Sequence, residues 1–179
     1  MDIFDLLMAS GWYPGRCVDT STAESVLVQK GYRLHNAAIA VLAEFSGLTI
    51  HGPSDPVKSH ARQMCLRIDA DQPMEDPRSC RDYSDAVGDI LVPVGTELCL
   101  TVLVGERGAV WGSYGSEYGF IADSFVEAVG RIFLSPPSEW SLDRTLPPGP
   151  DAEERIRRRQ LEDERHQAGS WRRFWARRM

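Results

Sequence analysis

The residues best suited to catalysis lie in one short segment, between His51 and His60. The intervening residues, GPSDPVKS, include Asp55 and two serines, so a base, an acid and a hydroxyl group are close in sequence. The chain lacks the G-x-S-x-G turn that exposes a nucleophilic serine in hydrolases. The spacing of the two histidines also fits no metal-binding pattern. We predict that both are solvated loop residues and that the chain has no catalytic residues; a small enzyme using this loop is the weakest alternative.

The cysteines give no sign of a metal or disulfide framework. Four are present: Cys17, Cys65, Cys80 and Cys99. None forms a C-x-x-C pair, and no histidine lies at zinc-finger spacing from them. Cys65 and Cys99 lie in apolar runs, where a thiol packs as a small hydrophobic group. We expect reduced thiols, no metal site and no cofactor.

The chain reads as a cytoplasmic protein without membrane contact. Its first residues, MDIFDLLMASGW, carry Asp2 and Asp5 and lack the basic region of a secretory signal. No window approaches the roughly 18–20 apolar residues that a membrane helix needs.

The net charge of −6 is unevenly distributed. Residues 1–150 hold 20 acids and 11 basic residues, whereas residues 151–179 hold nine arginines and six acids. An acidic body repels nucleic acid and attracts a basic partner. We therefore predict a basic protein partner and no direct nucleic-acid binding by residues 1–150. The acidity would equally serve solubility alone.

The segment GSYGSEYG, residues 112–119, is the preferred binding feature. It is interpreted as a flexible loop that exposes Tyr114, Glu117 and Tyr118, because tyrosine gives large contact area at little entropic cost. The flanking Trp111 and Phe120 are expected to be strand residues that face the core. An acidic segment, residues 69–85, would form a rim around these anchors through Asp76, Asp82 and Asp85.

The hydrophobic pattern predicts an α+β domain with its helices first. Helical spacing over residues 2–11 places Ile3, Phe4, Leu6, Leu7 and Met8 on one face. A second helix over 19–31 begins at Asp19 or Thr20, and a third over 34–48 is capped by Asn36.

The middle of the chain then alternates as strands do. Strands are expected at 48–52 and 61–69, followed by a proline-rich loop at 70–79 and a short helix at 82–91. A hairpin over 96–115 turns at GERG. A closing helix at 123–134 begins at Asp123 or Ser124, with Glu127 near the N3 position. Residues 135–150 form a proline-rich linker, and residues 151–179 form a charged tail, helical or partly disordered.

The order of several short landmarks is more specific than any one of them. They are Trp12, Pro14, Arg16, Glu44, Phe45, Gly47, Pro93 and Gly95, with the closing helix after them. In this order the chain resembles the SUKH superfamily of bacterial immunity proteins, and within it the third SUKH group, over about residues 8–134. We take residues 1–134 as the corresponding domain.

This resemblance implies helices packed on a bent, mostly antiparallel sheet. It also implies a protein that binds a cognate toxin, of the nuclease or nucleic-acid deaminase type, and neutralises it without being an enzyme. The alternative is an interaction adaptor of the same fold that uses its arginine-rich tail for an anionic partner. The landmarks near Trp12 fit a structural role, with Arg16 reaching a carboxylate such as that of Glu44, and they also fit direct binding.

Overall fold

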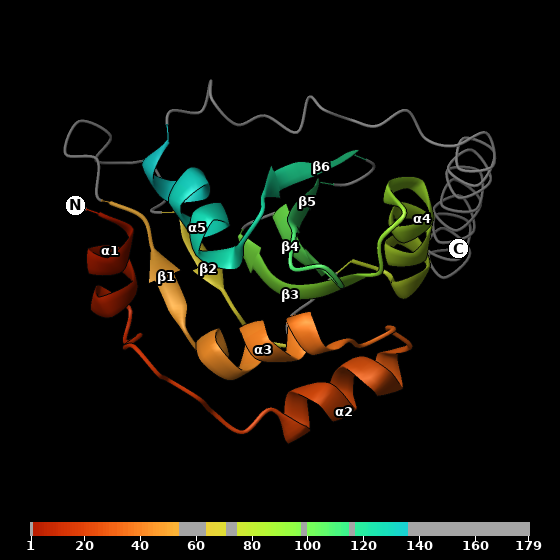
Figure 1. Cartoon of the computed structure of the whole chain (residues 1–179), viewed down its shortest axis with the longest axis horizontal. Helices are drawn as coiled ribbons and strands as arrows, with labels where there is room; N and C mark the ends of the chain where they lie inside the picture. The colour runs from red at the N-terminus through yellow and green to blue at the C-terminus, as the bar shows by residue number, and fades with distance from the viewer. Residues whose placement is uncertain (1, 54–63, 71–74, 98–99, 115–116, 136–179) are drawn as a thin grey trace, which may run out of the picture. The chain divides into compact units, whose positions relative to one another are not determined.

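The computed structural model describes residues 2–53, 64–70, 75–97, 100–114 and 117–135. All of them belong to one compact unit. The elements occur in the order α1 (Ile3–Ala9), α2 (Ser21–Lys30), α3 (Asn36–Phe45), β1 (Thr49–His51), β2 (Cys65–Arg67), α4 (Pro77–Val87), β3 (Leu91–Glu97), β4 (Leu100–Gly105), β5 (Val110–Tyr114), β6 (Glu117–Ala122) and α5 (Phe125–Leu134). The predicted α+β class is confirmed (Figure 1). The predicted linker and tail, apart from Ser135, lie outside the described residues.

The six strands form one antiparallel sheet in which each strand pairs with the next in sequence. Every residue of the central strand β4 is buried, and α3 packs against both β3 and β4. Figure 1 shows α1 and α5 at one end of this sheet and α4 at the other, with α2 and α3 between them. This arrangement gives the domain two ends of different character.

The helix α5 forms from a strongly amphipathic stretch of sequence. Ser124 caps it by accepting a hydrogen bond from the backbone N–H of Glu127. Its buried face is apolar: Phe125, Ala128, Val129, Ile132 and Phe133. The ring of Phe125 lies 4.8 Å from that of Phe45 in α3, which joins the two helices through the core.

The helix α4 is longer than the pattern suggested, because the residues that looked like a loop begin it. Asp76 accepts a hydrogen bond from the backbone N–H of Arg78, and Pro77 occupies the first turn, where its missing N–H costs nothing. Gly88 ends the helix with φ = 66°. The prediction of one or two turns was therefore wrong.

Two further predictions needed correction. His35, not Asn36, caps α3: its Nδ1 accepts a hydrogen bond from the backbone N–H of Ala38. The segment 112–119 is not a flexible loop, because its described residues belong to β5 and β6, which pair with each other. Gly112 of β5 and Gly119 of β6 pair with each other in the sheet.

Candidate functional site

The turn after α1 is fastened to the end of α3 by two side chains. The indole N–H of Trp12 donates to the Glu44 carboxylate at 3.0 Å. The guanidinium of Arg16 donates to the backbone carbonyls of Glu44 at 2.5 Å and of Ser46 at 2.7 Å. The predicted partner Glu44 was right, but Arg16 uses its carbonyl and leaves the carboxylate to Trp12. These bonds satisfy carbonyls at a helix C-terminus that have no partner within the helix.

The remaining landmarks near this turn also have structural contacts. The Trp12 ring stacks on Phe45 with centroids 6.3 Å apart, and both side chains are buried. Gly47 has φ = 78°, a conformation that favours glycine. Pro14 is exposed in the turn between Trp12 and Arg16. The turn is thus rigidly held, and Tyr13 at its tip is 57 % exposed.

The two landmarks in β3 lie where this strand departs from regular pairing. The register shifts between Pro93 and Gly95. A Cβ at Gly95 would lie 2.6 Å from the carbonyl oxygen of Arg67 in β2. Glycine therefore lets the two strands approach at this irregularity.

The outer face of α1 is apolar and acidic. Phe4 and Met8, one turn apart, are 49 % and 52 % exposed, so the prediction that both join the buried face was wrong. Asp2 and Asp5 are exposed beside them and bond to each other's backbone N–H groups, at 2.8 Å and 3.1 Å. The apolar side of α1 needs only the fully buried pair Leu6 and Leu7.

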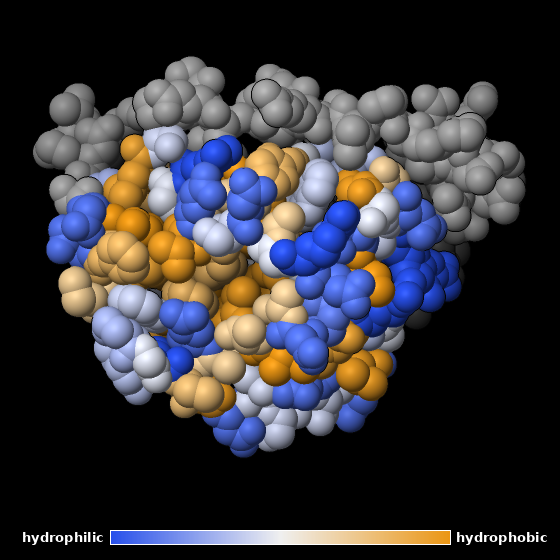
Figure 2. Space-filling model, viewed as in Figure 1, coloured by the Kyte–Doolittle hydropathy of each residue, from blue (hydrophilic) through white to orange (hydrophobic). Residues whose placement is uncertain are grey.

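The opposite end of the domain is hydrophilic and carries both signs of charge. Figure 2 shows apolar residues gathered over α1 and α5, and strongly hydrophilic residues over α4. The exposed arginines beside the acids at this end are Arg33, Arg78, Arg81 and Arg107. Of the predicted acidic residues, Asp76 caps the helix, Asp82 is half-buried and Asp85 is exposed.

The predicted aromatic anchors do not converge on these acids. Tyr118 is only 4 % exposed and stacks on Tyr83 of α4 at 4.6 Å, so its predicted exposure was wrong. Its cross-strand partner Ser113 donates to the carboxylate of Glu75, which fixes this face of the hairpin against α4. Tyr114, the next residue along β5, is exposed and lies on the other face of the sheet.

Glu117 pairs with Tyr114 in the sheet, and its side chain lies outside the described set. Trp111 and Phe120 pack edge to face with centroids 5.5 Å apart, and both are half-buried, less deeply than expected. The structure therefore brings the α4 acids to one side and Tyr114 to the other.

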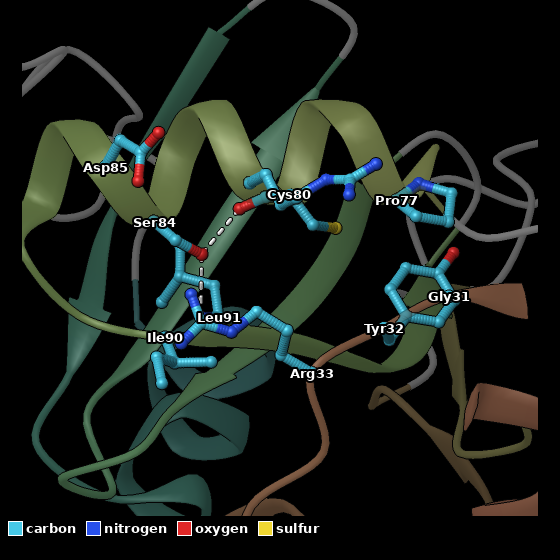
Figure 3. Close-up of a pocket in the computed structure, with 10 residues that line it drawn as sticks. Gly31, Tyr32, Arg33, Pro77, Cys80, Ser84, Asp85, Ile90 and Leu91 are labelled. Carbon is cyan, nitrogen blue, oxygen red and sulfur yellow. Dashed lines mark hydrogen bonds between the residues drawn. The ribbon is translucent and has the colours of Figure 1, made fainter.

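A shallow groove runs between α4, the start of β3 and the segment joining α2 to α3 (Figure 3). The Ser84 hydroxyl closes its floor, since it donates to the Cys80 carbonyl at 2.5 Å and accepts from the Leu91 N–H at 2.9 Å. The groove continues into a hollow of about 350 Å³ lined by Arg33, Asp85 and charged residues of the β4–β5 turn. Its lining mixes cations and anions and contains no reactive group.

Burial changes the acidity of several side chains in the described part of the domain. Burial raises the pKa of the Cys80 thiol, and also that of the Tyr32 hydroxyl, which donates to the carbonyl of Glu75. A protonated thiol is a poor nucleophile. Burial likewise raises the pKa of Glu97, one of whose carboxylate oxygens is buried without a hydrogen-bond partner.

The other sequence-based chemical candidate falls largely outside the described residues. His51 is exposed in β1, and residues 54–63 are not described. Among the described residues, no three histidine, cysteine or acidic side chains converge to hold a metal ion. No helix in this part of the chain has the length and apolar character required to cross a membrane.

The structure is an α+β domain, and the surfaces at its two ends are suited to contact with another protein. Comparison with family models extends this: residues 2–134 match the SUKH-3 immunity protein family. The chain therefore belongs to this family, as the order of its landmarks indicated. Neither the curated proteins nor the solved structures gave a significant match. Membership implies an immunity function exerted by binding a cognate toxin.

Proposed function

We propose that this protein neutralises a toxin that acts on nucleic acid, a nuclease or a deaminase, by covering the toxin's substrate-binding surface. It acts in the cytoplasm of the producing cell and takes no part in chemistry itself. The observation that carries the proposal is the family match over residues 2–134, which includes every described helix and strand.

The charge of the body supports a basic target. Residues 1–150 carry nine more acids than basic residues. An enzyme that grips a phosphate backbone presents lysines and arginines to it. An acidic protein competes for that surface and associates fast, because opposite charges steer the encounter.

The fixed positions of the polar groups support occlusion as the mechanism. Several cations of the body are engaged within it: Arg16 and Lys30 donate to backbone carbonyls, and Arg131 donates to both Glu127 and the Ile121 carbonyl. The surface charge that a partner contacts is therefore mainly that of the acidic residues. An inhibitor of this kind needs a complementary surface and no reactive group.

Co-expression tests the proposal directly. The probe is the toxin domain encoded by the gene adjacent to this one, produced in a host that it kills. We expect the full chain to restore growth, and one molar equivalent of purified chain to abolish the activity of the toxin on nucleic acid. Continued killing with the chain present at equal or higher level would contradict the proposal, as would turnover of a substrate by the chain alone.

A further inference from the structure

The two ends of the domain differ in what they offer a protein partner. We define the N-terminal surface as Asp2, Phe4, Asp5, Met8 and Tyr13, on α1 and the turn that follows it. Three of the seven large apolar side chains that are exposed in the described part of the chain lie here. The others are Met64 before β2, Tyr114 in β5, Leu134 in α5 and Val28 in α2, which is 59 % exposed.

Phe4 and Met8 lie together on α1, and the turn that carries Tyr13 begins beside Phe4. Phe4 and Met8 are one helical turn apart on the same face of α1. The Phe4 ring lies 6.0 Å from the ring of Trp12, which directly precedes Tyr13. Clustered aromatic and methionine side chains are the residue types enriched in protein interfaces.

The charge of this surface has one sign. Every ionisable side chain from residue 2 to 19 is an acid, except Arg16, Tyr13 and Cys17. The guanidinium of Arg16 is turned inward onto two carbonyls, so it does not offset the exposed carboxylates. The exposed carboxylates of Asp2 and Asp5 lie at the rim of the apolar cluster. At the α4 end, by contrast, four exposed arginines accompany the acids.

The surface is also held in place before any partner arrives. The reciprocal bonds of Asp2 and Asp5 fix the start of α1, and Trp12 and Arg16 fix its end to α3. Ile3 packs beside Gly130 of α5, within 4.0 Å of the position a Cβ would occupy there. Ordering costs on binding are therefore small.

We infer that the N-terminal surface is the docking site for the toxin, and that it meets a cationic region of the toxin that has an apolar depression for Phe4 and Met8. Charge complementarity assigns the occupant, because an acidic, apolar surface without free cations matches a basic protein that binds nucleic acid. The inference rests on the proposed function, and it lies within the residues matched by the family. The α4 acids and Tyr114 remain predictions and serve as the comparison.

Binding kinetics of the full chain with the toxin domain encoded by the adjacent gene test the inference. F4S/M8S is expected to weaken the complex at least about tenfold, mainly through faster dissociation. V28S, which removes an equally exposed apolar group from α2, is the matched control, with a change below about twofold. Unfolding curves verify that both variants are folded.

Two further variants remove negative charge without changing side-chain size, so they test the role of charge separately from packing. In D2N/D5N the amide oxygens still accept the two backbone hydrogen bonds. We expect association to slow by about threefold or more at low salt, with the difference fading at high salt. D85N/E106Q neutralises two exposed acids at the α4 end and should change association by less than about twofold.

The outcomes separate the two proposals. If the parent chain binds and F4S/M8S behaves like V28S, or D85N/E106Q slows association more than D2N/D5N, the docking site is wrong while the proposed function stands. If the parent chain neither binds nor inhibits the toxin, both fail. If the chain alone forms dimers that F4S/M8S separates, and the toxin binds both forms equally, a second copy is the occupant and the inference is overturned.

Discussion

The α1 end and the α4 end of this domain use the same residue types in opposite ways. At the α1 end, carboxylates and apolar side chains are exposed together, and Arg16 is turned inward. At the α4 end, tyrosines are buried and the acids Glu75, Asp76 and Asp89 bond to the hydroxyl of Ser113 or to backbone N–H groups. Acids at both ends therefore bond to backbone N–H groups, but those at the α1 end stand beside exposed apolar side chains.

The largest difference in stability is expected between alanine substitutions of two adjacent aromatic residues at the α1 end. Trp12→Ala removes a buried ring and leaves Glu44 without its indole partner, so the free energy of unfolding should fall by about 3–5 kcal/mol. Tyr13→Ala removes an exposed ring and should change it by less than about 0.5 kcal/mol. Urea unfolding followed by circular dichroism measures both. Equal losses would show that Tyr13 is part of the fold and not of a free surface.

The same contrast applies to two tyrosines of the hairpin. Tyr118→Ala opens the stack on Tyr83 and should cost about 2–4 kcal/mol, because it removes a buried ring between β6 and α4. Tyr114→Ala, at an exposed position, should be nearly neutral. Thermal unfolding of the two variants gives the comparison. A neutral Tyr118→Ala would mean that α4 is not fastened to the sheet through this contact.

Two glycines test how tightly each end is packed. A Cβ at Gly105 would collide with the Asp89 carboxylate, which also accepts from the Glu106 N–H, so Gly105→Ala should destabilise by about 1–3 kcal/mol. At Gly130 the nearest atom would be 3.9 Å away, in Ile3. Gly130→Ala should stabilise α5 by about 0.5–1 kcal/mol. Chemical denaturation measures the free energy of unfolding of both variants. Because the two expected changes have opposite signs, the test does not depend on their exact sizes.

A smaller effect should appear in the pH dependence of stability. Burial raises the pKa of Glu97 in the folded protein above its ordinary value of 4.5. The folded state therefore holds this proton more tightly than the unfolded state does. At pH values above the folded pKa the burial penalty is fully present, and it disappears as the pH falls through the folded pKa towards 4.5.

Glu97→Gln should consequently be more stable than the parent at pH 7, and this advantage should shrink steadily towards pH 4. Unfolding free energies of both proteins across this range measure it. An advantage that does not vary with pH would assign the effect to packing, and the absence of any advantage would show that the carboxylate is solvated.

Much of the fold was predictable because local patterns agree with tertiary packing. The apolar spacing of α5 and the alternation in β4 were both visible in sequence. The helix α4 was underestimated because Asp76 and Pro77 are typical of loops and also of helix starts. Only the presence of a following helix distinguishes the two.

The candidate site was harder to predict, because exposure depends on residues far away in the chain. Tyr118 is buried by Tyr83, which no local pattern links to it. Phe4 and Met8 were assigned to the core, although a helix of seven residues buries only Leu6 and Leu7 fully. The Asp2–Asp5 capping pair was the available signal that α1 begins at Ile3 and turns Phe4 outward.

Amide hydrogen exchange of the full chain, free and bound to the toxin domain encoded by the adjacent gene, tests the central claim most directly. The account predicts slower exchange on binding in residues 2–16, with residues 76–88 unchanged. Slower exchange in residues 76–88 with residues 2–16 unchanged would contradict it.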